Sequence, residues 1–271
     1  MPMTSPNQPR TARLYHAAGA AASAAVSPSL AAAIVTATLA TYLVVAMVVP
    51  RGVVVLAAQA VLAVVPIAAV VVARGRTAID VRGALGLRVA RPRFFVAAIA
   101  IGATTWYLNM WIVALLPITE RQTRALSELV DRPSLVAALA MFALVPAVCE
   151  EIVFRGILAR ALGGQLRLVF AAVISAAVFS IYHLSLAQAV PTLTLGAVLA
   201  VIAIRAGSIL PTMIAHALNN AMAIVMSRDE LPDLTAWLAR HPAAALTSCA
   251  SATALGLTIA LRAPGHAHRD G

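Results

Sequence analysis

Lysine is absent from this chain: all twenty basic residues are arginine, and only ten residues are acidic, so the formal net charge is +10. Charged residues make up 11% of the sequence and aromatic residues 5%, whereas 62% of the residues are hydrophobic. A soluble domain carries about 25% charged residues, so this composition excludes one and indicates a membrane protein. The arginines are scattered singly between apolar runs, which fits topology signals and contacts to anionic lipid. We therefore expect a lipid bilayer around the chain and no nucleic-acid partner.

Cysteine is nearly absent as well. The two cysteines, Cys149 and Cys249, both fall in apolar runs and have no CxxC spacing, which argues against a disulfide framework and a thiolate metal site. No internal repeat is apparent, so an inverted-repeat transporter gains no support.

Long apolar runs are what the sequence does contain. Because a bilayer core needs roughly 20 apolar residues per helix, we predict an all-α fold, a polytopic transmembrane helix bundle of about eight spans within residues 29–262. The spans are expected near 30–49, 53–73, 94–116, 134–158, 168–187, 190–204, 209–226 and 242–261. The run at 190–204 is short, so we expect it to be tilted, broken or shielded by its neighbours.

The two ends of the chain are predicted to be tails. Residues 1–28 are rich in Ala, Ser and Pro and contain Arg10 and Arg13. A weakly hydrophobic stretch follows these charges, so a signal peptide is possible, but we favour a disordered cytoplasmic tail. Residues 263–271 are predicted to form a second cytoplasmic tail.

The arginines also predict the orientation. With eight spans, thirteen arginines fall on the side of the termini and six on the other, leaving Arg155 aside. The positive-inside rule then places both termini in the cytoplasm. The richness in Ala, Val, Arg and Pro suggests a GC-rich bacterial genome, so we expect a multi-pass protein of the bacterial cytoplasmic (inner) membrane.

Two adjacent carboxylates follow the apolar run 135–148. A charged side chain at bilayer depth costs at least a few kcal/mol, so Glu150 and Glu151 are candidates for function. Glu151 and Arg155 are four residues apart on one helix face and are predicted to form an ion pair. Glu150 points about 100° away and is left facing the interior, as a general base would. The alternative is a buried charge cluster that only fixes helix packing.

Two later spans carry further polar groups. His183 ends the sequence Phe179-Ser-Ile-Tyr-His, while His216 and Asn220 lie four residues apart on one helix face. Such groups can simply join helices by hydrogen bonds. Together with Glu150, however, they supply a base that activates water and donors that hold an oxyanion, which is typical of a proteolytic site.

Three motifs carry a resemblance to a known family. Glu-Glu-x-x-x-Arg (150–155), Phe-x-x-x-His (179–183) and His-x-x-x-Asn (216–220) follow one another on successive spans. In this order they resemble the CAAX-protease and bacteriocin-processing family (CPBP, or Abi), intramembrane endopeptidases that include the type II CAAX prenyl endoproteases. The resemblance covers about residues 134–226, the predicted protease core.

The resemblance implies a role for each motif residue. Glu150 would be the catalytic glutamate that activates water, and Glu151 and Arg155 would complete the first motif. His183 would lie beside the water. The oxyanion would be stabilised by the last pair, His216 and Asn220.

Several alternatives stay open. Glu150, His183 and His216 would make an acceptable set of catalytic zinc ligands, although the sequence has no HExxH motif. We favour the metal-free mechanism without a cofactor, because Asn220 is a better oxyanion donor than zinc ligand. Glu150 and His183 could instead form the relay of a proton-coupled transporter, or the site could be an inert scaffold. The substrate is expected to be a membrane-associated protein or peptide of unknown identity.

Overall fold

The computed structural model describes residues 26–50, 53–75, 79–117, 127–128 and 130–262. The predicted tail 263–271 lies outside these ranges, as does the tail 1–28 except for its last three residues. Within these ranges all regular secondary structure is helical, as predicted.

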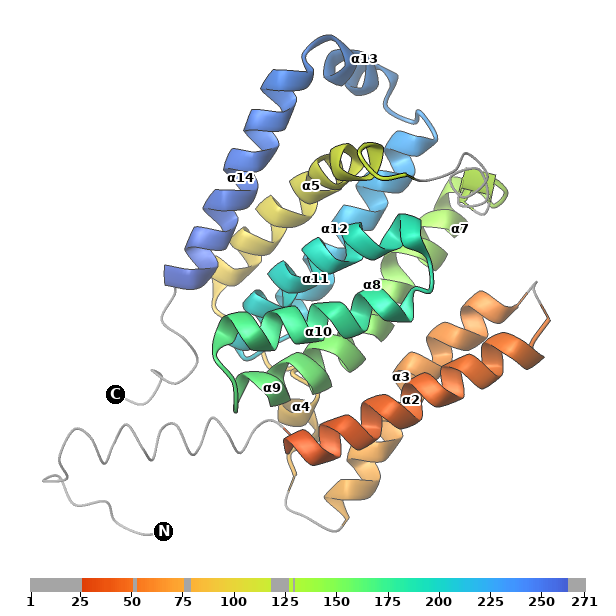
Figure 1. Ribbon diagram of the computed structural model, residues 1–271, viewed down its shortest axis with the longest axis vertical. Helices are drawn as coiled ribbons and strands as arrows, with labels where there is room; N and C mark the ends of the chain where they lie inside the picture. The colour runs from red at the N-terminus through yellow and green to blue at the C-terminus, as the bar shows by residue number, and fades with distance from the viewer. Residues whose placement is uncertain (1–25, 51–52, 76–78, 118–126, 129, 263–271) are drawn as a thin grey trace, which may run out of the picture.

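Eight long helices run back and forth through the described part of the molecule (Figure 1). Seven of them are α2 (Pro28–Val48), α3 (Val54–Arg74), α5 (Pro92–Ala114), α10 (Leu168–Tyr182), α11 (Leu186–Ala206), α12 (Leu210–Ser227) and α14 (Pro242–Arg262). The eighth joins α7 (Leu135–Leu139), the π-helix η1 (Ala140–Leu144), α8 (Val145–Glu151), the π-helix η2 (Ile152–Ala159) and α9 (Arg160–Gly163). Two short helices are α4 (Val81–Ala84) and α13 (Pro232–Arg240).

Six of the eight long helices in the described ranges are long and apolar enough to cross a membrane alone. The two others are α10, which has only 15 residues, and α12, which has 18 and carries His216, Asn219 and Asn220. The protein is therefore a multi-pass membrane protein with a helical bundle. The predicted count of eight complete spans is not confirmed.

The boundary between the fifth and sixth long helices differs from the prediction. Helix α10 ends at Tyr182, five residues early, and α11 has 21 residues rather than being short. The turn lies at Leu184, whose φ of 49° interrupts the helix. Pro191 lies inside α11, about one helical turn after its start. A proline this near the helix end removes only one backbone hydrogen bond, so the helix can begin before it.

Both ends of the described bundle lie on one side. Figure 1 shows the start of α2, the end of α14, α4 and α9 at the same end of the molecule. This arrangement fits the predicted location of both termini on one side. Which side faces the cytoplasm stays a prediction.

The segment before α5 packs against η2 and the start of α12. Leu85 is buried, and its carbonyl oxygen lies so close to Gly156 that a Cβ there would be only 2.6 Å away. The Ile209 N–H donates a hydrogen bond of 2.9 Å to the Gly86 carbonyl. Gly86 has a φ of 74°, which favours glycine. These backbone contacts fix the start of α12 against η2.

Candidate active site

The two adjacent glutamates end α8, where the helix changes to the π-helical η2. Glu150 is 4% exposed and Glu151 is fully buried. Pi-helical turns are rare and often occur at functional sites. The surroundings of the two carboxylates differ, as their adjacent helix positions predicted.

Glu151 and Arg155 form the expected pair. Arg155 Nη1 lies 3.0 Å from Glu151 Oε1, and both side chains are fully buried. The groups are not aligned as a hydrogen bond, so the attraction is mainly electrostatic. The guanidinium lies over the Phe179 ring, 4.1 Å from its centroid. The arginine of the first motif and the phenylalanine of the second therefore contact each other.

His216 joins the two carboxylates. Its Nδ1 lies 3.0 Å from Glu151 Oε1, and its Nε2 lies 3.8 Å from Glu150 Oε2. An ionised carboxylate only accepts, so the contact with Glu151 places a hydrogen on Nδ1 and directs Nε2 toward Glu150. Glu151 thus orients the imidazole as well as pairing with Arg155, a second contact that the spacing did not predict.

Gln59 of α3 is a site residue that no motif indicated. Its Nε2 donates a buried hydrogen bond of 2.9 Å to Glu150 Oε1. Its own Oε1 is buried and has no hydrogen-bond partner among the described residues. One feature of the sequence could have indicated this residue: Gln59 is the single polar residue in the predicted span 53–73.

Aromatic rings and His183 complete the wall around Glu150. His183 Nδ1 lies 2.9 Å from the Phe179 carbonyl oxygen, which leaves Nε2 available. The imidazole packs edge-on against Phe179 and Tyr182, with centroid distances of 4.8 and 4.9 Å. Both His183 and Tyr182 are near enough to Glu150 to interact with it electrostatically.

Asn220 is held by a different set of contacts. Its Nδ2 donates a hydrogen bond of 3.1 Å to the carbonyl of Phe142 in η1. Pro146 lacks the N–H that this carbonyl would meet in an α-helix, so the Asn220 amide replaces that donor. The Asn219 amide donates to Asn220 Oδ1 over 3.2 Å. Within the described ranges no hydrogen bond links Asn220 to Glu150.

The structure therefore gathers four of the other five predicted residues near Glu150. These four are Glu151, Arg155, His183 and His216. Asn220 lies one helical turn beyond His216 on α12. One of its two amide hydrogens is used by Phe142, and the other stays available to a ligand.

The zinc alternative gains no ligand group. The described residues contain no cluster of three or more His, Cys, Asp or Glu side chains that could hold a metal ion. Glu150 Oε1 is bonded to Gln59, and His216 Nδ1 is bonded to Glu151. These bonds do not involve Glu150 Oε2 or the Nε2 atoms of His183 and His216, so the zinc alternative stays an untested prediction, and the mechanism proposed below uses no metal.

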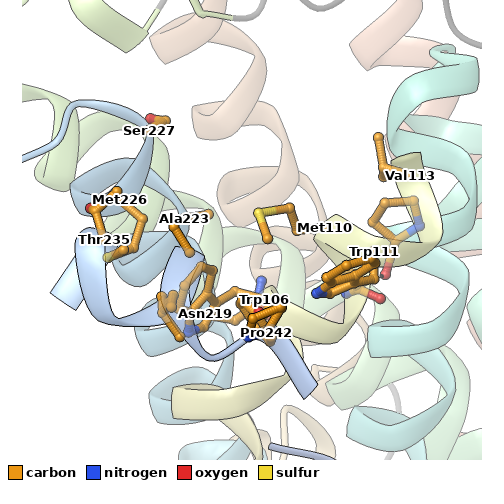
Figure 2. Close-up of a pocket in the computed structure, with 15 residues that line it drawn as sticks. Trp106, Met110, Trp111, Val113, Asn219, Ala223, Met226, Ser227, Thr235 and Pro242 are labelled. Carbon is orange, nitrogen blue, oxygen red and sulfur yellow. Dashed lines mark hydrogen bonds between the residues drawn. The ribbon is translucent and has the colours of Figure 1, made fainter. Parts of the chain in front are cut away.

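A separate apolar cavity of about 740 Å³ lies between α5, α12, α13 and the start of α14. Figure 2 shows Trp106, Met110 and Trp111 of α5 on one side and Asn219, Ala223 and Met226 of α12 on the other. Asn219 is bonded to Thr105 and to Asn220. The cavity thus reaches the neighbour of Asn220, but none of the six predicted residues lines it.

Comparison with known proteins identifies the central part of the chain. The family model for type II CAAX prenyl endopeptidase Rce1-like proteins matches residues 132–222. This range holds all three motifs and excludes Gln59 on α3. A search of curated proteins found no match, and a search of solved structures found none either. Residues 132–222 thus match the family of Rce1-like type II CAAX prenyl endopeptidases, as the motifs predicted, within a multi-pass membrane protein.

Proposed function

We propose that this protein is an intramembrane endopeptidase in which Glu150 activates the attacking water. The observation that carries this proposal is the environment of Glu150, a buried carboxylate that has Gln59 on one oxygen and His216 Nε2 at 3.8 Å from the other. Peptide hydrolysis needs a general base, and Glu150 is a carboxylate within reach of a histidine. Both residues lie in the range that matches an endopeptidase family.

The reaction balances with these groups alone. Glu150 takes one hydrogen of a water molecule, and the water oxygen bonds to the scissile carbonyl carbon. The carbon–nitrogen bond of the tetrahedral intermediate then breaks, and Glu150 returns the proton to the leaving amine. The products are a carboxylic acid and an amine, and Glu150 is regenerated.

His216 and Asn220 are proposed to stabilise the oxyanion. His216 Nε2 can donate only when the imidazole carries both hydrogens, since Nδ1–H donates to Glu151. Two carboxylates and one guanidinium leave one negative charge in this buried cluster, which an imidazolium would neutralise. Asn220 would supply the amide hydrogen that Phe142 does not use.

The substrate class follows from the family. The family description names a CAAX prenyl endopeptidase, so a membrane-associated peptide with a prenylated C-terminal CAAX sequence is the first candidate substrate. A peptide precursor without a prenyl group is the second.

Cleavage assays on reconstituted protein test this function. The protein in lipid vesicles is incubated with a farnesylated CAAX peptide and with a pool of unmodified peptides, and products are identified by mass spectrometry. Wild-type protein should release a product, and Glu150→Gln should release none while staying folded. Glu128→Gln, at an exposed ion pair with Arg132, is the matched control and should keep full activity. Wild-type cleavage by Glu150→Gln would refute the role of Glu150.

A further inference from the structure

Gln59 lies outside the range that matches the Rce1-like family but inside the candidate active site. It belongs to α3, ninety-one residues before Glu150, and reaches that carboxylate through a buried bond of 2.9 Å. The α2–α3 hairpin packs against α8 and η2, the two segments that carry the first motif. The contact between Gln59 and Glu150 therefore depends on the packing of the α2–α3 hairpin against residues 132–222.

The Gln59 amide is only half satisfied. Its Nε2 has Glu150 as partner, whereas its Oε1 is buried without a hydrogen-bond partner in the described ranges, although the residue is only 7% exposed. A buried acceptor left unpaired is costly, and the great majority of buried polar groups are paired. An apolar side chain would pack into α3 without that cost. The Nε2 group of Gln59 is thus explained by its bond to Glu150, and the Oε1 atom is available to accept a hydrogen bond from a ligand.

We infer that Gln59 positions Glu150 and its water, an inference that rests on the proposed endopeptidase function. The Nε2–H holds Glu150 Oε1, so Oε2, on the side of His216, is the oxygen that accepts a proton from the water. The Gln59 Oε1 accepts the other hydrogen of the same water. The water is then held by two acceptors, and its lone pair is directed at the substrate carbonyl.

Gln59 is expected to affect the reaction rate through the geometry of Glu150. A carboxylate on a flexible side chain can rotate, and a misplacement of about 1 Å at a reacting group can cost about 10²-fold in rate. Phe154 and Phe179 pack near the site and have no polar side-chain atom, whereas the Tyr182 side chain also lies near Glu150. The Gln59 amide donates a buried hydrogen bond of 2.9 Å to Glu150 Oε1 and so restrains the rotation of this carboxylate.

Two substitutions remove the amide donor in different ways. Gln59→Met keeps an apolar side chain of similar length, and Gln59→Glu keeps the shape and one oxygen but replaces the NH₂ group. For the peptide cleaved by the wild-type protein, kcat should fall about 10- to 100-fold in both variants with little change in KM, because the misplacement acts on the chemical step. Gln165→Met, at an exposed turn, is the control and should behave as wild type.

Folding and function are separated by two further measurements. Thermal unfolding of each variant in detergent shows whether the assay temperature lies below its transition. The second measurement is the KM of each variant, which should stay near the wild-type value because a misplaced water slows the chemical step without weakening substrate binding.

Three results would overturn the role of Gln59. The first is a wild-type kcat in either Gln59 variant, and the second is a loss of rate that disappears at a lower temperature where the variant is folded. The third is a raised KM with an unchanged kcat, which would assign Gln59 to substrate binding instead. These failures differ from failure of the proposed function, in which Glu150→Gln itself keeps activity or the wild-type protein cleaves no peptide.

Discussion

Single residues at this site act through shared partners. Glu151 faces both Arg155 and His216, each within 3.0 Å, and all three side chains are buried. Glu150, one residue earlier, meets Gln59 instead. The adjacent glutamates thus have different partners, which fits the proposal that Glu151 organises the charges while Glu150 acts as the base.

The consequence for Glu151 is a loss of both stability and rate. Glu151→Gln removes the charge that compensates Arg155, and breaking a buried ion pair typically costs about 3–5 kcal/mol. Thermal unfolding in detergent should show a clear drop in Tm, and kcat should fall because His216 loses its orienting acceptor. Glu230→Gln, at a partly exposed pair with Arg228, should change neither. A Glu151→Gln variant that is as stable as wild type would contradict the predicted pairing.

Asn220 and Asn219 form a matched pair of amides. Asn220→Ala removes a proposed oxyanion donor, which typically costs about 10²–10³-fold in turnover, and also frees the Phe142 carbonyl. We expect a strong fall in kcat with little change in KM, and a modest fall in Tm. Asn219→Ala, which loses only its bond from Thr105 and its bond to Asn220, should lower Tm with a smaller effect on kcat.

Steady-state kinetics and thermal unfolding of both variants decide between the two roles of Asn220. Equal catalytic effects, or a Tm loss in Asn220→Ala without a loss of turnover, would identify Asn220 as a contact between helices only.

The next prediction concerns whether peptide cleavage at this site requires a metal ion. We predict that exhaustive treatment with o-phenanthroline leaves peptide cleavage unchanged and that elemental analysis finds no stoichiometric zinc, because the mechanism uses the Glu150 carboxylate alone. Activity that is lost with the chelator and returns only with added zinc would instead establish Glu150, His183 and His216 as ligands in a rearranged site.

Close helix contacts position these residues at the scale of elements. Helix α5 approaches α12 at Gly102, where an added Cβ would lie 2.7 Å from the Cα of Ala215, the residue before His216. Only glycine lets the two backbones come this near. The position of His216 therefore depends on a contact with a helix that lies outside the range matching the family.

Gly102→Ala should consequently disturb both stability and the site. Overpacking of this kind typically costs about 1–3 kcal/mol, and it would push α12 away from α5. We expect a lower Tm and a lower kcat in the peptide assay. Gly75→Ala is the control, because its Cβ would meet nothing nearer than 3.4 Å and should leave both values near wild type. Tolerance of alanine at both glycines would show that the α5–α12 contact can relax.

Local sequence signals gave the positions of most elements but not all their ends. The short apolar run 190–204 suggested a short sixth helix, yet α11 spans Leu186–Ala206. The end of α10 depends on Leu184, which adopts a positive φ that no residue type in this stretch announces. A leucine rarely takes this conformation, and Leu184 is 72% exposed, so no burial of its own side chain explains the positive φ.

At the scale of the whole molecule, the prediction concerns its orientation in the membrane. Helix α14 begins beside Arg240 and ends at the opposite end of the bundle (Figure 1). From the split of thirteen arginines against six we predict that both termini are cytoplasmic. Reporter fusions at the C-terminus and after Arg240 should therefore report opposite sides, with the C-terminal one inside. Two fusions on the same side would show that α14 does not cross.

The sequence by itself determined the helical membrane fold, the order of the motifs and the identity of the charged residues. These follow from composition, run length and the spacing of four residues that pairs Glu151 with Arg155, all of which are local along one helix. The family match to residues 132–222 agrees with the same motifs.

Only the tertiary structure decided which groups face Glu150. Gln59 and His216 reach it from helices 91 residues earlier and 66 residues later in the chain, and their contacts depend on the packing of α3 and α12. The same holds for Asn220, whose amide donates to the carbonyl of Phe142, 78 residues earlier in the chain. Spacing along a helix fixes which side chains share a face, but the partner on another helix is set by close packing of backbones, such as Gly102 against Ala215.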